Sequence, residues 1–209
     1  MKDYVTVKGE TTIETVIERS RFITYLSNVE TEEQAKAFID KIRKMHPFAT
    51  HNCYAYVLGA NSEKQKFSDD GEPQGTAGLP MLDVIKKKEI VDVCVVVTRY
   101  FGGIKLGAGG LVRAYSSATA DGLNSAVKVK YTVSVDCEIK LSYEKYSKLL
   151  KFFENKKVEI KDTLFDAEII VRLVMPEEVF EEYSKELSDY FSGTLYLNKT
   201  NTVHYPFKV

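Results

Sequence analysis

The stretch that decides the fold is Thr98-Arg99-Tyr100-Phe101-Gly102-Gly103-Ile104-Lys105-Leu106-Gly107-Ala108-Gly109-Gly110-Leu111-Val112-Arg113. Before it, residues 91–97 form a run rich in β-branched side chains, which predicts a buried strand. Behind it, residues 111–126 have the apolar spacing of a helix. The five glycines from Gly102 to Gly110 therefore predict a strand-to-helix turn that another molecule can approach closely.

Such a turn is typical of an anion-binding surface. Backbone N–H groups at a helix N-terminus, together with the helix dipole, favour a negative group, and three cations flank the glycines. The residues expected to form this anion-binding or nucleic-acid-binding surface are Arg99, Tyr100, Gly102, Gly103, Lys105, Gly107, Gly109, Gly110 and Arg113. The spacing matches neither the phosphate loop of nucleoside triphosphatases nor the dinucleotide fingerprint. The alternative, that the glycines only allow a sharp turn and close helix packing, stays open.

Composition limits the classes of protein that this chain can represent. A length of 209 residues suffices for one large or two small domains. The formal net charge of −1 excludes a whole-chain electrostatic argument for nucleic acid or membrane. The separated Cys53, Cys94 and Cys137 indicate buried, reduced thiols. Because no apolar run suits a signal peptide or a membrane span, we expect a soluble cytoplasmic protein with no membrane partner and no cofactor.

The two halves of the chain predict different architectures. The first half alternates strands (4–7, 11–18, 21–26, 51–58, 91–98) with helices at 32–45, 79–88 and 111–126, and the helix at 32–45 begins at the capping box Thr31–Gln34. A polar segment, 61–78, is expected to be a long loop. Residues 129–209 follow the order β-α-β-β-α-β of a ferredoxin-like domain. The sequence thus predicts an α+β protein with domains at 1–128 and 129–209.

The polar loop contains a second distinctive motif, Ser68-Asp69-Asp70-Gly71-Glu72-Pro73, followed by Gly75-Thr76-Ala77-Gly78. Its carboxylates lack the spacing of a calcium loop. We expect Ser68, Asp69, Asp70 and Glu72 to support the loop, through pairing with Arg99 or Lys105 or by accepting hydrogen bonds from turn N–H groups. Such pairing would hold the loop against the glycine turn.

Candidate catalytic chemistry centres on His46, His51 and Cys53, which lie within eight residues of one another. Their spacing matches no zinc-ligand pattern, so we expect no metal site. Cys53 as a nucleophile would need a histidine base that the sequence cannot place. If the chain is an enzyme, His51, Asp69 and Asp70 are the candidate acid and base residues.

Three motifs in this order resemble the YigZ/IMPACT-like family: residues 46–56 (HPFATHNCYAY), residues 68–78, and residues 99–107 (RYFGGIKLG). The resemblance implies a first domain like domain 2 of ribosomal protein S5, also seen as domain IV of elongation factor G. It implies a second, ferredoxin-like domain similar to domain V of that factor. Eukaryotic relatives are linked to translation control through a regulator of a translation-factor kinase, a role that depends on a further domain.

Three hypotheses for function follow. The first is a translation-associated binding protein that contacts RNA, the ribosome or a translation-regulating protein through the glycine-rich turn. The second is a hydrolase that acts on an anionic or phosphorylated small substrate in the same cleft. The third is a protein–protein adaptor. We expect binding rather than catalysis.

Overall fold

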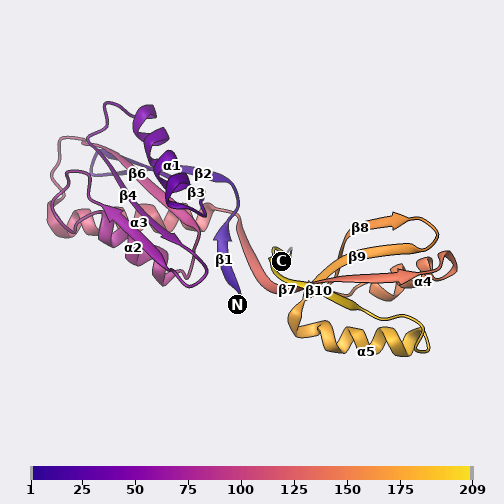
Figure 1. Cartoon of the computed structure of the whole chain (residues 1–209). Helices are drawn as coiled ribbons and strands as arrows, with labels where there is room; N and C mark the ends of the chain where they lie inside the picture. The colour runs from indigo at the N-terminus through magenta and orange to yellow at the C-terminus, as the bar shows by residue number, and fades with distance from the viewer. Residues whose placement is uncertain (1, 208–209) are drawn as a thin grey trace. The chain divides into compact units, whose positions relative to one another are not determined.

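A computed structural model describes residues 2–207 and divides them into two compact units, residues 2–130 and 131–207 (Figure 1). Residues 1, 208 and 209, the outer ends of the predicted domains, lie outside the described residues. Both units combine helices with an antiparallel sheet, so the protein is of mixed α+β architecture. We call them the N-terminal and C-terminal units.

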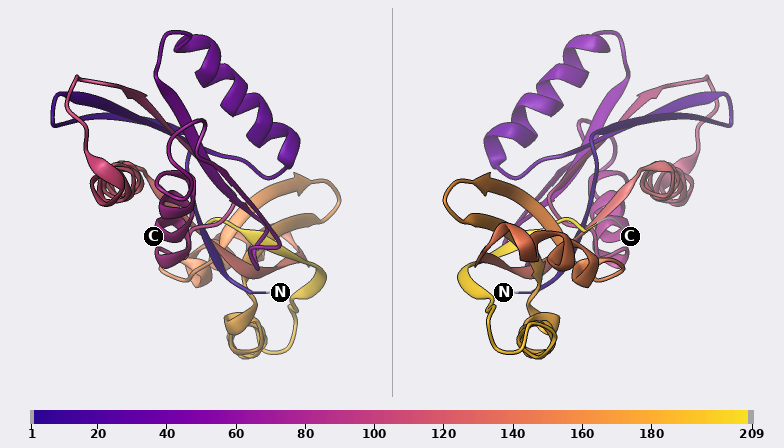
Figure 2. Two further views of the ribbon diagram at one scale, coloured as in Figure 1. Left: turned by 90° about the vertical axis from the view of Figure 1, so that its left-hand side faces the viewer. Right: turned by 90° about the vertical axis from the view of Figure 1, so that its right-hand side faces the viewer.

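The N-terminal unit is a five-stranded sheet covered by helices on both faces. Its elements are β1 (Tyr4–Val7), β2 (Glu10–Ile17), β3 (Ser20–Asn28), α1 (Glu32–Met45), β4 (His51–Leu58), β5 (Lys64–Ser68), α2 (Gly78–Lys87), β6 (Val93–Tyr100) and α3 (Gly107–Ser125). The strand order is β2-β3-β6-β4-β5, and each neighbouring pair is antiparallel. Helix α1 lies on one face, and α2 and α3 lie on the other (Figures 1 and 2).

The central strand β6 explains why the apolar run before the glycines does not alternate with polar residues. Val93, Val95 and Val97 pack in the core shared with α2 and α3. Cys94 and Val96 pack in the core beneath α1. Because successive strand side chains point to opposite faces, a strand covered on both sides must be apolar throughout. The predicted buried strand is confirmed, and it carries the glycine-rich stretch at its end.

Of two expected segments in this unit, one is confirmed and one is wrong in part. The helix at 32–45 and its capping box, in which Thr31 and Gln34 bond each other's backbone N–H groups, are confirmed. The prediction of one loop across 61–78 is wrong in part, because β5 occupies Lys64–Ser68. This strand pairs with β4 at the edge of the sheet and is mostly exposed. An exposed polar edge strand gives no hydrophobic periodicity, so the sequence could not indicate it.

In the C-terminal unit four strands form an antiparallel sheet, and two helices pack against it to form the core. Its elements are β7 (Lys128–Leu141), α4 (Tyr143–Phe153), β8 (Glu159–Phe165), β9 (Ile169–Pro176), a 3-10 turn (Glu177–Val179), α5 (Phe180–Tyr190) and β10 (Asn198–Tyr205). The strand order is β10-β7-β9-β8, and each neighbouring pair is antiparallel. The predicted element order is therefore present. Strand β7 begins before Lys130, within the N-terminal unit.

Candidate functional site

The glycine segment, which we define as residues 102–110, contains glycines with different structural roles. Gly103 and Gly107 have left-handed φ values of +87° and +69°, a region that favours glycine. At Gly102 an added Cβ would overlap the backbone carbonyl of Arg19, in the turn between β2 and β3. Gly109 has open surroundings, with Arg113 Nη1 at 3.6 Å the only atom near an added Cβ among the described residues. The segment is both a close-packed turn and an accessible backbone surface.

The prediction that the helix begins at Leu111 is wrong, because α3 begins at Gly107. Gly107, Gly109 and Gly110 therefore belong to the first turn of the helix rather than to the loop. Glycine has a poor intrinsic helix propensity. Here the helix is stabilised instead by its buried face, which includes Leu111, Tyr115 and Ala118, since packing of an apolar face supplies most helical stability in proteins.

The N-terminus of α3 has no side-chain cap. Its N-cap residue is Leu106, whose side chain accepts no hydrogen bond, and the first helical turn contains no acidic residue. Gly107, Ala108 and Gly109 are exposed. The first N–H groups of a helix lack intrahelical partners, and the helix dipole places partial positive charge there. This end of a 19-residue helix therefore favours an anion.

Two of the three basic residues expected to bind an anion lie at this end of α3. Lys105 and Arg113 are exposed, and neither forms an ion pair with any other residue of the range 2–207. Both line a groove of about 460 Å³ that is also lined by Gly110 and Glu18. The groove joins two positive side chains to the uncapped end of α3.

The third cation, Arg99, lies inside the fold. Its Nη1 donates to Glu72 Oε1 at 2.7 Å, and both side chains are buried. The hydroxyl of Tyr115 donates to the same oxygen at 2.8 Å, and burial raises the pKa of this phenol, which keeps it protonated. His51 Nε2 lies 3.6 Å from Glu72 Oε2. Arg99 thus neutralises a loop carboxylate and leaves its charge unavailable at the surface.

Tyr100 contributes to a second internal cluster. Its hydroxyl lies 2.8 Å from Nδ1 of His46, and the hydroxyl of Tyr25 lies 2.6 Å from Nε2 of the same ring. Burial lowers the pKa of His46, and the nearby Arg21 lowers it further. Tyr100 therefore fixes the end of β6 to the end of α1.

The carboxylates of the loop at 68–78 bind groups of the protein itself. Asp69 accepts hydrogen bonds from the N–H groups of Gly75, Ala77 and Gly78 at 2.8, 3.0 and 2.8 Å, the last two at the start of α2. Asp70, whose φ of +43° is left-handed, accepts from the N–H of Asn52 and from Arg43, each at 2.7 Å.

Ser68 and Glu72 complete the support of this loop. Ser68 Oγ accepts a hydrogen bond from the N–H of Asp70 at 3.1 Å, and Glu72 forms the buried pair with Arg99. Together with Asp69 and Asp70, these contacts fasten the loop to β4, to α1 and to the end of β6. The loop carboxylates therefore bind donors of the protein itself.

The candidate acid and base residues show the same pattern of internal bonding. His51 Nδ1 lies 2.9 Å from the carbonyl oxygen of Asp70, and since that oxygen can only accept, Nδ1 carries a proton. The thiol of Cys53 donates to the carbonyl of Asp69 at 3.0 Å, and burial raises its pKa far above the usual range. Thiolate is the nucleophilic form of cysteine, so this environment disfavours Cys53 as a nucleophile. No three His, Cys, Asp or Glu side chains among residues 2–207 converge as metal ligands do.

The sequence does not predict the surroundings of two residues in this region. Tyr115 completes the cluster at Glu72, 43 positions earlier in the chain; its spacing from Leu111 indicates a buried helix face but not this partner. Phe48 lies between α1 and β4 with 90% of its surface exposed. Its neighbours in the sequence predict only the end of a helix at Pro47.

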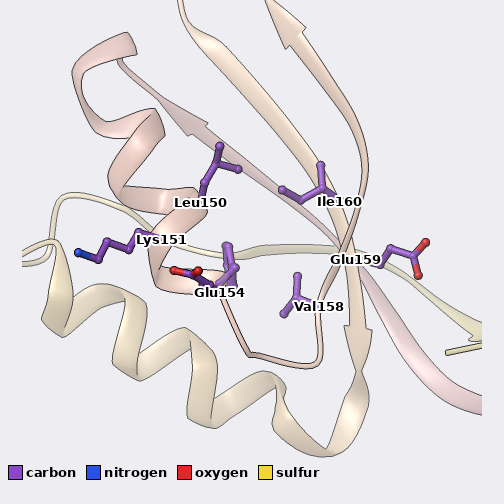
Figure 3. A pocket seen from close by; sticks show the side chains of 7 residues that line it. Leu150, Lys151, Glu154, Val158, Glu159 and Ile160 are labelled. Carbon is purple, nitrogen blue, oxygen red and sulfur yellow. The ribbon is translucent and has the colours of Figure 1, made fainter. Parts of the chain in front are cut away.

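A larger groove lies in the C-terminal unit, between the end of α4 and the edge strand β8. It has a volume of about 590 Å³. Figure 3 shows Leu150 and Ile160 facing one another across it, with Val158 below them and the Lys151 side chain directed away. Its lining is mainly apolar, so it offers less to an anion than the groove at α3. No helix within residues 2–207 has the length and apolar character needed to cross a bilayer.

Comparison with known proteins identifies the family. Residues 18–123 match the Impact N-terminal domain. The chain is similar to the IMPACT family member YvyE of Bacillus subtilis, with 60% identity over 59% of this chain and 57% of that protein. An IMPACT family member of Haemophilus influenzae is 40% identical over 93% of this chain and 96% of its own length.

A solved structure described as that of a hypothetical protein is also similar. It is 33% identical, covers 96% of this chain and 98% of its own, and superimposes with a TM-score of 0.62. The matched domain spans β3 to α3, with the buried Arg99–Glu72 cluster and the glycine segment inside it. On these matches, the chain belongs to the IMPACT family.

Proposed function

We propose that this protein is a translation-associated binding protein whose glycine segment contacts the phosphate backbone of RNA, free or in the ribosome. The observation that carries the proposal is the uncapped N-terminus of α3, flanked by Lys105 and Arg113 without acidic partners among the described residues. Family membership supports a role in translation, because the resemblance links eukaryotic members to its control.

The geometry suits phosphate rather than a base edge. Gly107, Ala108 and Gly109 are exposed residues whose N–H groups can donate to phosphate oxygens, and two cations add a charge-assisted component. In this proposal Arg99 and Tyr100 do not touch the ligand. They position the segment, because one binds Glu72 and the other binds His46.

We further propose that the N-terminal unit is like domain 2 of ribosomal protein S5, and that the C-terminal unit is ferredoxin-like and similar to domain V of elongation factor G. The β-α-β-β-α-β order and the strand order β10-β7-β9-β8 support the second assignment. The domain boundary at 128/129 stays part of this proposal. Both likenesses are to modules of the translation apparatus.

Hydrolysis in the same region has weaker support. The carboxylates of Asp69 and Asp70 accept hydrogen bonds from backbone and side-chain donors that fold the loop, and His51 is oriented by the Asp70 carbonyl. An acid or base must reach a substrate proton. These groups hold the loop in place instead.

Filter binding with a structured RNA at two salt concentrations tests the proposal. Binding should weaken steeply with salt, and removing both cations in Lys105→Ala/Arg113→Ala should reduce the slope of log K against log salt by about 1 for each phosphate that the variant no longer neutralises. Lys86→Ala/Lys87→Ala, which removes two exposed lysines of α2, is the matched control. Absent binding, or binding unchanged by salt, would contradict the proposal.

A further inference from the structure

The turn between α1 and β4 presents a phenylalanine to solvent on an ordered backbone. Phe48 is 90% exposed, yet the residues around it are fixed: the N–H of Ala49 donates to the His46 carbonyl at 3.1 Å, and the N–H of Thr50 donates to the Arg99 carbonyl at 2.8 Å. Burial of such a side chain would be favourable, because it removes apolar surface from water. A fixed turn that keeps the ring in water therefore calls for an explanation.

This turn lies beside the start of the glycine segment. Thr50 Oγ1 accepts a hydrogen bond from the N–H of Phe101 at 3.0 Å, which joins the two loops. Phe101 is itself 47% exposed, and Met45 and Ile104 are exposed at 54% and 37%. We call Met45, Phe48, Phe101 and Ile104 the aromatic patch. Its residues come from the end of α1, from the turn that follows this helix, and from the segment after β6 where the glycines begin.

The chemistry of the aromatic patch matches unpaired nucleotides. The Arg99 guanidinium lies 5.6 Å from the centroid of the Phe101 ring, and about half of the Phe101 surface remains exposed. Lys105 directly follows Ile104, so positive charge for phosphate adjoins rings that can stack on bases. Protruding aromatic rings beside a cationic backbone-binding surface are the arrangement by which proteins hold single strands.

A protein partner fits less well. A peptide helix docks its apolar face in a groove, whereas a ring with nine-tenths of its surface in solvent stands out from the protein. A flat base can stack on such a ring without an enclosing wall. Paired bases in a duplex are stacked on each other and offer no free face to it.

We propose that the aromatic patch selects single-stranded RNA, by stacking unpaired bases on Phe48 and Phe101 while the glycine segment binds the adjoining phosphates. The inference rests on the proposed function and names its ligand class more narrowly. The binding surface then has two parts: a backbone-binding part that any RNA can use, and a stacking part that requires unpaired nucleotides.

The test compares the affinities of the full chain for an unstructured oligoribonucleotide and for its duplex. We expect tighter binding of the single strand, and a loss of roughly tenfold for Phe48→Ala or Phe101→Ala with duplex binding unchanged. Phe67→Ala, which removes a phenylalanine 42% exposed on β5, is the matched control. A fluorescent purine analogue in the oligonucleotide should be quenched by the wild type and less by Phe48→Ala.

The outcomes separate the inference from the proposed function. If Lys105→Ala/Arg113→Ala weakens binding but the Phe48 and Phe101 variants bind both RNAs like the wild type, the inference is overturned and the proposed function stands. If neither RNA binds, both fail. A nuclease-resistant protein complex that needs Phe48, without oligonucleotide binding, would assign the patch to a protein partner and also overturn the inference.

Discussion

The loop at 68–78 and the glycine segment at 102–110 are similar in composition, but their charged side chains differ in whether they are paired within the protein. Both are glycine-rich and carry ionised side chains. In the loop, Asp69, Asp70 and Glu72 all bind donors of the protein. In the glycine segment, Lys105 and the nearby Arg113 face solvent without an acidic partner among residues 2–207.

The comparison distinguishes charged side chains that stabilise the fold from charged side chains that remain available to a ligand. Buried Glu72 requires Arg99 because an isolated carboxylate in the interior is strongly unfavourable, so their pairing follows from burial alone. Exposed cations need no partner, and water screens them. Ligand binding is therefore expected where charge remains open, at the glycine segment, while the loop keeps that segment in position.

The largest effect is expected from breaking the buried pair. Glu72→Ala leaves Arg99 buried without its carboxylate and Tyr115 without its acceptor, which should lower the free energy of unfolding of the N-terminal unit by about 3–5 kcal/mol. Hydrogen exchange at the amides of β6 measures this unit by itself. Lys41→Ala, which breaks the exposed pair with Glu10, should cost about 1 kcal/mol or less.

The double variant Glu72→Met/Arg99→Met sharpens the same test. Because it removes both charges and keeps apolar volume, it should be clearly more stable than Glu72→Ala. Equal destabilisation by Glu72→Ala and Lys41→Ala would mean that the cluster does not stabilise the unit.

The next largest effect on stability is expected at the glycines, which differ in how closely other atoms approach them. Gly102→Ala places a methyl group against the Arg19 carbonyl and should destabilise the unit by about 1–3 kcal/mol. Gly109→Ala meets nothing closer than Arg113 Nη1 at 3.6 Å among the described residues and lies in α3, so it should be neutral or stabilise by up to about 1 kcal/mol. Thermal unfolding compares them directly; a Gly109→Ala loss as large as that of Gly102→Ala would refute this division.

The smallest effect is expected from His46. Its pKa is lowered in the native protein, so the unfolded chain takes up this proton at a higher pH than the native one does. The stability it contributes should be complete above the ordinary histidine pKa of about 6.5 and fall as the pH drops below it. Urea unfolding of wild type and His46→Gln across this range measures the effect; parallel pH profiles would show that His46 does not contribute.

Patterns local in sequence predicted much of the fold. The buried strand before the glycines, the capped helix at 32–45 and the β-α-β-β-α-β order all follow from periodicity and capping chemistry, which act between neighbouring residues. The edge strand β5 and the first turn of α3 could not be predicted, because an exposed strand has no apolar period and glycines oppose a helix that only packing stabilises.

The sequence by itself determined most of the elements, the family resemblance and the presence of cations around the glycines. Only the tertiary structure decided which cations remain available, since Arg99 meets Glu72 across 27 positions and Tyr115 meets it across 43. It also joined the turn that carries Phe48 to the start of the glycine segment, through the hydrogen bond from the Phe101 N–H to Thr50 Oγ1. The physical reason is that burial and pairing depend on distances in space, which local residue patterns do not encode.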